Sequence, residues 1–286
     1  RYEAAGAVKG IERARNFTQN DSHIFCTKAQ IEDEFKGVVD LILEVYKDFD
    51  IDASNCEFRL SLRDKESKTN KYFDDDEMWD TAENALRNVL NDIGIKYFEA
   101  KDEAAFYGPK LDILIHPAVG NPVALSTIQL DFLLPKRFDL TYIAEGGEKE
   151  TPVVIHRAIL GSLDRFIAFL LEETKGILPT WLAPLQVKVI PVNSEYQSDY
   201  AEEVNEFLKE NNIRTETDTR DEKLGYRLRE AQTSKVPYTL ILGDNEKENK
   251  QISYRLYGEK ETTTVSFDEF LKIINEDIKS KKRRDK

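Results

Sequence analysis

Cysteines and long apolar runs are scarce in this sequence, and both scarcities narrow the class of protein. Its 286 residues include only two cysteines, Cys26 and Cys56, which are too few for a disulfide framework. No apolar run approaches the roughly 18–20 residues needed to span a bilayer, and no secretory signal opens the chain. We therefore expect a cytoplasmic protein with no membrane partner.

Positive charge is also in short supply. The 41 Lys and Arg residues are outnumbered by 54 Asp and Glu residues, which gives a net charge of −13. Non-specific binding to nucleic acid depends on counterion release by clustered cations, so this composition argues against a general polyanion binder. A specific nucleic-acid partner stays open, because a local surface can differ in sign from the whole protein.

Two nearby prolines mark the plainest boundary along the chain. Pro179 and Pro184 prevent a continuous helix or central strand between them. Before them, strand-like and helical patterns follow one another irregularly, which predicts an α+β domain with a mainly antiparallel sheet over residues 1–178. After them, strands alternate with helices, which predicts an α/β domain with a partly parallel sheet over residues 185–286.

Hydrophobic periodicity places the expected elements. In the first domain it predicts strands at 17–25, 58–62, 111–116, 124–133 and 153–156, and helices at 29–48, 75–93 and 162–173. In the second it predicts strands at 187–192, 213–217, 238–242 and 252–257, and helices at 198–209, 224–234 and 267–279. The acidic run at 73–79 could hold a metal, but capping and the helix dipole favour a helix start.

The segment before Cys26 carries an unusual polar face. Alternate side chains of an extended strand share a face. This groups Arg13, Arg15, Phe17, Gln19, Asp21 and His23. The face could simply be solvated, or it could be a binding site, because guanidinium groups fit phosphates and an aromatic ring can stack on a base. Cys26 falls on the face opposite His23, so we expect a core thiol rather than a local metal pair.

Several segments carry family motifs. Arg1-Tyr2-Glu3 is followed by 13–26 (RARNFTQNDSHIFC), 105–110 (AFYGPK), 129–132 (QLDF), 154–166 (VIHRAILGSLDRF) and 179–184 (PTWLAP). In order and spacing these resemble the threonyl-tRNA synthetases, a class II aminoacyl-tRNA synthetase family, with motif 2 at the start and motif 3 at 154–166. The resemblance covers essentially the whole chain. It implies a class II catalytic domain, mainly antiparallel and N-terminally incomplete, followed by an α/β anticodon-binding domain.

The resemblance also implies an activity and its requirements. The reaction would be threonine activation with ATP and transfer to tRNA(Thr), with Mg²⁺ and Zn²⁺ as cofactors and a homodimer as the full-length enzyme. Activation is a problem of positioning and charge stabilisation. The implied catalytic residues are Arg1, Lys110 and Arg165.

The implied ATP site is drawn from both motifs. Its residues are Arg1, Glu3, Arg13, Phe17 and Arg165. Arg1 would bind the α-phosphate and Arg13 the terminal phosphates. Glu3 would accept a hydrogen bond from the adenine amino group, while Phe17 and Arg165 would cover the two faces of the base.

The implied amino-acid pocket combines polar side chains with zinc. Its threonine-binding residues are Gln19, Asp21, Tyr107 and Gln129. His23 and His156 resemble two of the family's three zinc ligands. Either could instead be a core or strand-end histidine, but both lie inside matching motifs in a chain with three histidines. His116 lies outside any motif and is expected to be structural. Zinc would take the amine and hydroxyl of threonine, which explains rejection of valine.

The second domain carries a nucleic-acid motif by the same resemblance. Residues 220–230 (RDEKLGYRLRE) resemble the anticodon-recognition segment. The positions that would contact bases are Asp221, Arg229, Glu246 and Arg255. Such side chains suit the reading of splayed bases through their edges. A surface ion-pair network is the alternative.

Three departures from the family pattern leave other hypotheses open. Motif 1 would lie upstream, as would the cysteine that serves as the third zinc ligand. The loop at 4–10 and Asp221 also differ from the commoner forms. The leading hypothesis is a fragment or domain of a genuine synthetase. The rivals are a non-catalytic tRNA-binding or regulatory paralogue and a general nucleotide-binding module.

Overall fold

The chain divides into two compact units, Arg1–Glu173 and Thr174–Lys286. The structure is a computed structural model and describes residues 2–4, 6–67, 71–117 and 122–283. Each unit has its own buried core, and each is described by itself.

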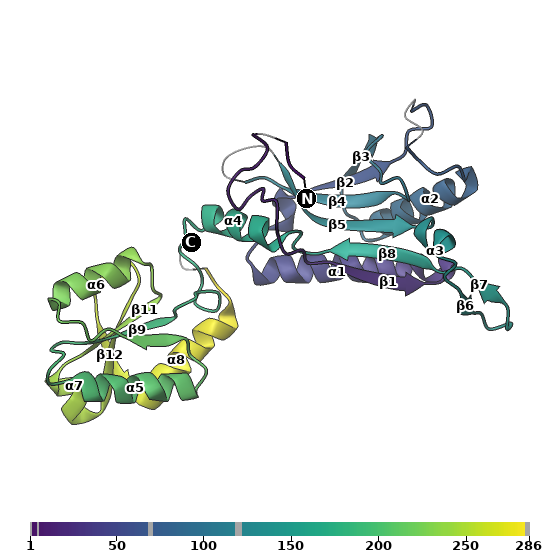
Figure 1. Cartoon of the computed structure of the whole chain (residues 1–286). Coiled ribbons are helices and arrows are strands. Elements are labelled where there is room, and N and C mark those ends of the chain that lie inside the picture. The colour runs from purple at the N-terminus through teal and green to yellow at the C-terminus, as the bar shows by residue number, and fades with distance from the viewer. Residues whose placement is uncertain (1, 5, 68–70, 118–121, 284–286) are drawn as a thin grey trace. The chain divides into compact units, whose positions relative to one another are not determined.

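A six-stranded sheet forms the centre of the first unit (Figure 1). Its strand order is β1 (Ser22–Cys26), β8 (Val153–Ala158), β5 (Val123–Asp131), β4 (Lys110–Ile115), β2 (Glu57–Leu62) and β3 (Tyr97–Lys101). All neighbouring strands run antiparallel except β2 and β3. The predicted mainly antiparallel sheet is confirmed. Strand β3 escapes prediction because its sequence, YFEAK, is short and carries only a brief alternation.

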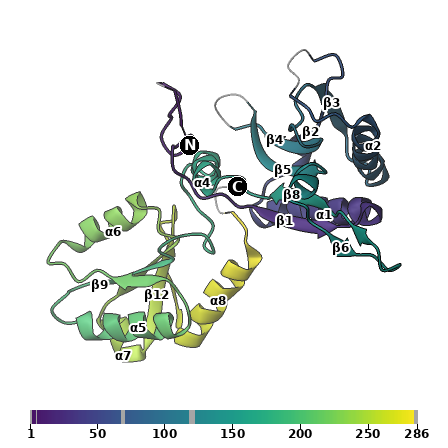
Figure 2. The same ribbon diagram turned by 45° about the vertical axis from the view of Figure 1, so that its right-hand side comes forward.

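Two amphipathic helices cover the apolar face of this sheet. Helix α1 (Ile31–Asp48) contacts β1, β5 and β8 and packs beside α2 (Asp76–Asp92), as Figure 1 and Figure 2 show. It buries Phe35, Val39, Ile42 and Tyr46, which recur at helical spacing. The Tyr46 hydroxyl lies 2.6 Å from Ser126 Oγ on β5, so a buried hydrogen bond joins the helix to the sheet. Both helices confirm the prediction from periodicity.

The acidic run at 73–79 serves the start of α2. The side chain of Asp75 accepts a hydrogen bond from the Met78 backbone N–H at 3.1 Å, which caps the helix. Asp76 pairs with Arg63 at 2.5 Å. The interpretation of this run as a helix start is therefore confirmed.

The first strand is shorter than the predicted 17–25. Strand β1 begins at Ser22, and the residues before it pair with the turn that leads into α4 (Leu163–Glu173). Asn20 causes this change of partner: its backbone N–H donates to Gly161 O at 2.8 Å, and its side-chain oxygen accepts from two N–H groups of the turn. A side chain that competes for backbone groups in this way ends regular strand pairing.

Farther upstream, the chain reverses direction. Lys9 and Arg13 exchange two backbone hydrogen bonds, at 3.1 and 3.2 Å. The chain bends again at 15–16 and regular strand begins only at Ser22, so the odd-numbered residues of 13–23 do not form one continuous strand face. The expected core position of Cys26 is confirmed: its side chain is buried, and burial raises the pKa of the thiol to about 11.

Shorter elements complete the first unit. They are helix α3 (Leu134–Arg137), the paired strands β6 (Tyr142–Ile143) and β7 (Lys149–Glu150), and 3-10 turns at Lys28–Gln30 and Ala53–Asn55. None of the helices formed by the described residues is long and apolar enough to cross a membrane.

The second unit is built on a five-stranded sheet. Its order is β10 (Thr215–Thr217), β9 (Val187–Pro191), β11 (Tyr238–Leu242), β12 (Gln251–Leu256) and β13 (Thr263–Ser266). The first three strands are parallel and the others antiparallel, so the predicted partly parallel sheet is confirmed. Helices α5 (Ser198–Glu210) and α8 (Phe267–Ser280) pack on its apolar face. Helices α6 (Leu224–Thr233) and α7 (Asp244–Asn249) complete the unit.

Candidate functional site

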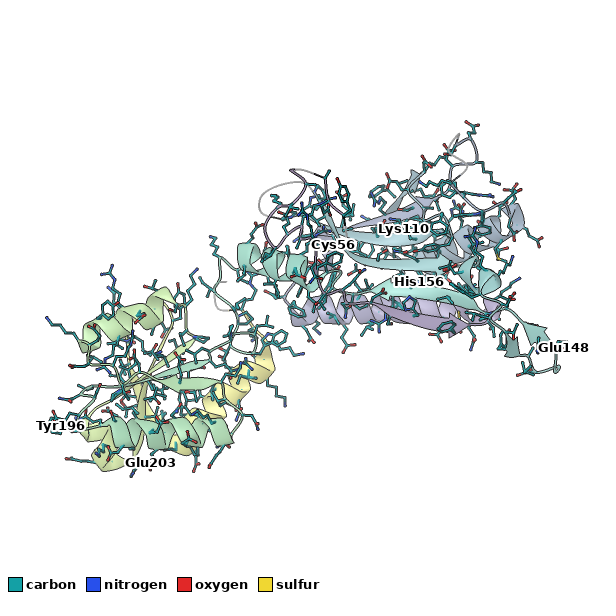
Figure 3. The ribbon with its side chains drawn as sticks, in the orientation of Figure 1. Cys56, Lys110, Glu148, His156, Tyr196 and Glu203 are labelled. Atoms are coloured by element: carbon teal, nitrogen blue, oxygen red, sulfur yellow. The ribbon has the colours of Figure 1, made fainter. Side chains whose placement is uncertain are left out.

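The register of the first sheet brings polar residues of five strands into one row. From β1 to β2 the directly paired residues are His23, His156, Gln129, Lys110 and Ser61. Paired residues on adjacent strands point to the same side of a sheet. That side is opposite the one from which Ser126 meets helix α1. Figure 3 marks Lys110 and His156 on β4 and β8.

The adjacent row of paired residues contains a buried carboxylate, that of Asp112. Asp112 Oδ2 accepts from Lys110 Nζ at 2.7 Å, from Arg59 Nη2 at 2.9 Å and from Ser61 Oγ at 3.1 Å. Its other oxygen accepts from Thr127 Oγ1 at 3.0 Å. Burial alone would raise the pKa of Asp112, but the Lys110 and Arg59 cations outweigh it and hold the pKa below its usual value. Asp112 therefore carries a negative charge near neutral pH.

A chain of hydrogen bonds leads from this carboxylate across the polar face. Gln129 Nε2 donates to Thr127 Oγ1 at 3.2 Å, and the Tyr107 hydroxyl donates to Gln129 Oε1. Burial, reinforced by the charges of Asp131 and Asp21, raises the pKa of Tyr107 to about 12. Its phenol is therefore protonated near neutral pH. Two of the four predicted threonine-binding residues, Tyr107 and Gln129, are therefore joined by a hydrogen bond.

Two glycines allow the backbone to approach closely around this network. A Cβ on Gly108 would lie 1.9 Å from Leu130 O, so only glycine lets the Tyr107 segment pack directly against β5. Gly161 has φ of +58°, and its Cβ would lie 2.7 Å from Leu125 O. Both positions fall inside the motif segments noted above.

A cavity of about 220 Å³ opens beside the polar face. Its walls include four predicted site residues, Phe17, Gln19, Gln129 and Arg165. Asp112, Thr127 and Ser162 also line it. Arg165 is held in place from two sides: its Nε donates to Glu12 O at 3.1 Å, and its backbone N–H donates to Ser162 Oγ at 3.3 Å. The cavity thus brings together an aromatic ring, a guanidinium group and two amides.

Two other predicted ATP residues bind each other. Arg13 Nε donates to Glu3 Oε2 at 3.2 Å, and the Glu3 side chain is only 5% exposed. If Glu3 bound an adenine amino group and Arg13 bound phosphates, this ion pair would have to open. Arg1 lies outside the described residues.

The histidine pair is in direct contact. The rings of His23 and His156 lie edge to face with centroids 4.6 Å apart, and the Tyr107 ring centroid is 5.3 Å from that of His156. His156 Nε2 lies 2.8 Å from Asp131 Oδ2, and Asp131 is buried. His116 instead contacts Glu57 at 3.0 Å, at the opposite end of β4 from Lys110.

Motif reasoning did not single out Asp112 and Thr127, which line the cavity, or Asn20, which bonds the cavity residue Gly161. Asp112 gave a usable signal, because a charged residue inside the strand sequence KLDILI demands a partner. Asn20 and Thr127 gave none, because both are common in loops and strands.

Two family matches agree with this geometry. The family described as "tRNA synthetase class II core domain (G, H, P, S and T)" matches residues 1–174. The chain belongs to this class II synthetase family. The family described as "Anticodon binding domain" matches residues 186–277, so the synthetase core is followed by an anticodon-binding domain.

The most similar proteins found include several threonine–tRNA ligases. The chain is 54% identical to a threonine–tRNA ligase of Geobacillus kaustophilus over 284 residues, 99% of this chain and 43% of that protein. It is also 54% identical to a threonine–tRNA ligase of Staphylococcus carnosus, with the same coverage. The chain therefore spans less than half the length of these relatives.

Solved structures support the same fold. The RNA-binding domain of a threonyl-tRNA synthetase from Cryptosporidium parvum superposes with a TM-score of 0.87 at 33% identity, covering 96% of this chain and 67% of that one. A putative threonyl-tRNA synthetase from Aeropyrum pernix gives 0.79 at 27% identity, covering 98% and 67%.

The synthetase core fits zinc only in part. The Asp131 carboxylate can fix the ring of His156 through Nε2 and leave Nδ1 to bind a metal, a common arrangement around zinc. His23 stands beside it. Within the described residues, however, no group of three or more His, Cys, Asp or Glu side chains could hold a metal ion. Two imidazoles are half of the four ligands that zinc usually takes.

The predicted anticodon residues occupy different settings in the second unit. Asp221 and Arg229 are exposed. Glu246 caps α7, accepting from Gly243 N at 2.8 Å and Ser253 Oγ at 2.7 Å. Arg255 Nη2 donates to Thr262 Oγ1 at 3.4 Å.

An ion-pair network does exist near the recognition segment, but other residues form it. Arg220 pairs with Asp218 at 2.6 Å and also with Glu230. These contacts hold the loop before α6, and the predicted base-contacting side chains are not among the three members.

Proposed function

We propose that this chain forms the part of a threonine–tRNA ligase that activates threonine with ATP and recognises tRNA(Thr). The observation that carries the proposal is the cavity, which brings predicted nucleotide and amino-acid residues together. The identity of 54% to threonine–tRNA ligases supports the choice of amino acid. The proposal implies that the chain acts in the cytoplasm within a longer, homodimeric protein.

The activation step needs charge stabilisation around the α-phosphate of ATP. A threonine carboxylate oxygen attacks the α-phosphorus, and the bond to pyrophosphate breaks. Phe17 and Arg165 would hold the adenine between them, and Arg1 would bind the α-phosphate. Lys110 would place a further cation near the reacting groups, and its contact with Asp112 holds it in position beforehand. Mg²⁺ would accompany the triphosphate.

The pocket for the amino acid lies along the histidine end of the row. Gln19, Asp21, Tyr107 and Gln129 would bind threonine there. His23 and His156 would supply two zinc ligands, with Asp131 orienting the second. When bound, zinc supplies a Lewis acid for the amine and hydroxyl of threonine. A site built around a hydroxyl rejects valine strongly, because its polar groups would be left unpaired.

Recognition of tRNA(Thr) falls to the second unit in this proposal. Asp221 and Arg229 are exposed and can reach splayed bases directly. Arg255 and Glu246 would contribute from β12 and α7. The Asp221 carboxylate can only accept hydrogen bonds from a base, whereas the amide that the family usually has at this position can also donate them.

Threonine-dependent exchange of pyrophosphate into ATP tests the proposal. The assay should compare this chain with a chimera in which it replaces the matching part of the Geobacillus kaustophilus relative, with zinc and magnesium present. The chimera should catalyse exchange with threonine and show at most background exchange with valine. Binding of tRNA(Thr) without any exchange would instead identify a non-catalytic paralogue.

A further inference from the structure

Asp112 fixes the direction of the hydrogen bonds that lead away from it. An ionised carboxylate has no proton and can only accept. The Thr127 hydroxyl, 3.0 Å from Asp112 Oδ1, must therefore give its single proton to the carboxylate. The positive charges of Lys110 and Arg59 favour the ionised form of Asp112.

The direction is passed on to Gln129. Since the Thr127 proton is committed, its oxygen can only accept from Gln129, 3.2 Å away. The Gln129 amide must then turn its Nε2 to Thr127 and its Oε1 to Tyr107. The flipped amide would place two acceptors against each other at Thr127, so the network excludes it.

Tyr107 is the last member of this relay. It donates its proton to Gln129 Oε1, so its oxygen offers lone pairs to anything else that approaches. Its ring lies 5.3 Å from that of His156, beside the proposed amino-acid pocket.

We propose that Asp112 and Thr127 are positioning residues that make the Tyr107 hydroxyl an acceptor for the N–H groups of the α-amino group of the amino acid. An amine whose lone pair is engaged by a metal or by a proton can only donate hydrogen bonds, so the relay matches it and disfavours a group that accepts only. The inference rests on the proposed function and adds specificity-determining residues to the same site. Neither positioning residue needs to touch the α-amino group.

Substitutions at Thr127 separate the relay from packing. Thr127→Val keeps the side-chain shape but removes the hydroxyl, whereas Thr127→Ser keeps the hydroxyl. In the chimera, Thr127→Val should raise KM for threonine about tenfold with KM for ATP within about twofold, because the Gln129 amide and the Tyr107 hydroxyl are no longer held in the orientation that accepts from the amine. Thr127→Ser should keep KM for threonine within about threefold of the parent, because the relay is intact.

Two further variants test the direction of the relay. Asp112→Asn introduces an amide that can donate to Thr127 and should raise KM for threonine as Thr127→Val does. Ser61→Ala removes another hydroxyl bonded to the same carboxylate, at 3.1 Å, but outside the relay. It should leave KM for threonine within about twofold of the parent.

The outcomes are distinct. Equal effects of Val and Ser at Thr127, or parallel rises in both KM values, would show a packing role and overturn the inference. Thermal unfolding of each variant identifies any that fails to fold. An inactive parent chimera would refute the proposed function itself, and with it the inference. If the parent chimera is active but Thr127→Val leaves its KM for threonine unchanged, the inference is refuted and the proposed function is not.

Discussion

Substituting each of two arginines on helix α6 by methionine should have different effects on stability. Arg227 is 2% exposed, and its guanidinium donates to three backbone oxygens, those of Asp218 at 2.8 Å, Glu222 at 3.1 Å and Val192 at 3.3 Å. Arg229 is exposed on the same helix. We expect Arg227→Met to unfold the loop before α6, and Arg229→Met to leave the fold unchanged.

The expected magnitude follows from these three bonds. Hydrogen bonds to charged groups contribute roughly 1.5–3 kcal/mol each, but not additively, and the methionine retains the apolar contacts of the arginine stem. Loss of the guanidinium should therefore lower the free energy of unfolding of the second unit by about 3–5 kcal/mol. Arg229→Met should change it by less than about 0.5 kcal/mol but weaken tRNA binding.

Urea unfolding followed by tryptophan fluorescence can measure this difference. The chain has two tryptophans, Trp79 in the first unit and Trp181 in the second, so each unit has its own reporter. Only the transition reported by Trp181 should move in Arg227→Met. A shift below about 1 kcal/mol, or an equal shift in Arg229→Met, would refute the structural role assigned to Arg227.

Three other predictions concern the first unit. The folded-state pKa of Asp112 lies below its ordinary value, so its ionic contribution to stability is complete above the ordinary value and lost as pH falls through the folded pKa. The difference in unfolding free energy between wild type and Asp112→Asn, measured by urea titration, should be constant from about pH 5 to 8 and decrease below about pH 4. Asp131→Asn should weaken zinc binding by about 10–100-fold in calorimetric titrations of the chimera, because His156 loses a charged partner; unchanged affinity would argue against His156 as a ligand. Tyr46→Phe should lower the free energy of unfolding of the first unit by about 1 kcal/mol, because one buried hydrogen bond to Ser126 is lost. An unchanged free energy of unfolding would contradict that bond.

Strong periodicity made much of the fold predictable. Helices α1 and α2 each carry a continuous apolar stripe, and Asp75 provides a recognisable cap. Helix α7 has the sequence DNEKEN and no such stripe; it forms because Glu246 returns to bond the Gly243 backbone N–H. Elements stabilised by one local contact give no periodic signal.

The candidate site was predictable to the extent that motif residues carry it. Alternation correctly set His23 and Cys26 on opposite faces, but it did not foresee that Asn20 would end the strand pairing. Nor could spacing show that Gln129 and Lys110 would stand side by side, since that depends on register between β4 and β5. The ion pair of Glu3 and Arg13 was equally invisible.

The pairing of β1 with β8 would make the proposed metal binding a measure of folding. His23 and His156 come from opposite ends of the first unit's sequence, and they meet only when the two strands are in register. An ion held by both rings is therefore bound by the folded unit and hardly at all by the unfolded chain. By mass action, the concentration of that ion would then set part of the stability of β1, and a chelator would destabilise the strand without breaking any covalent bond.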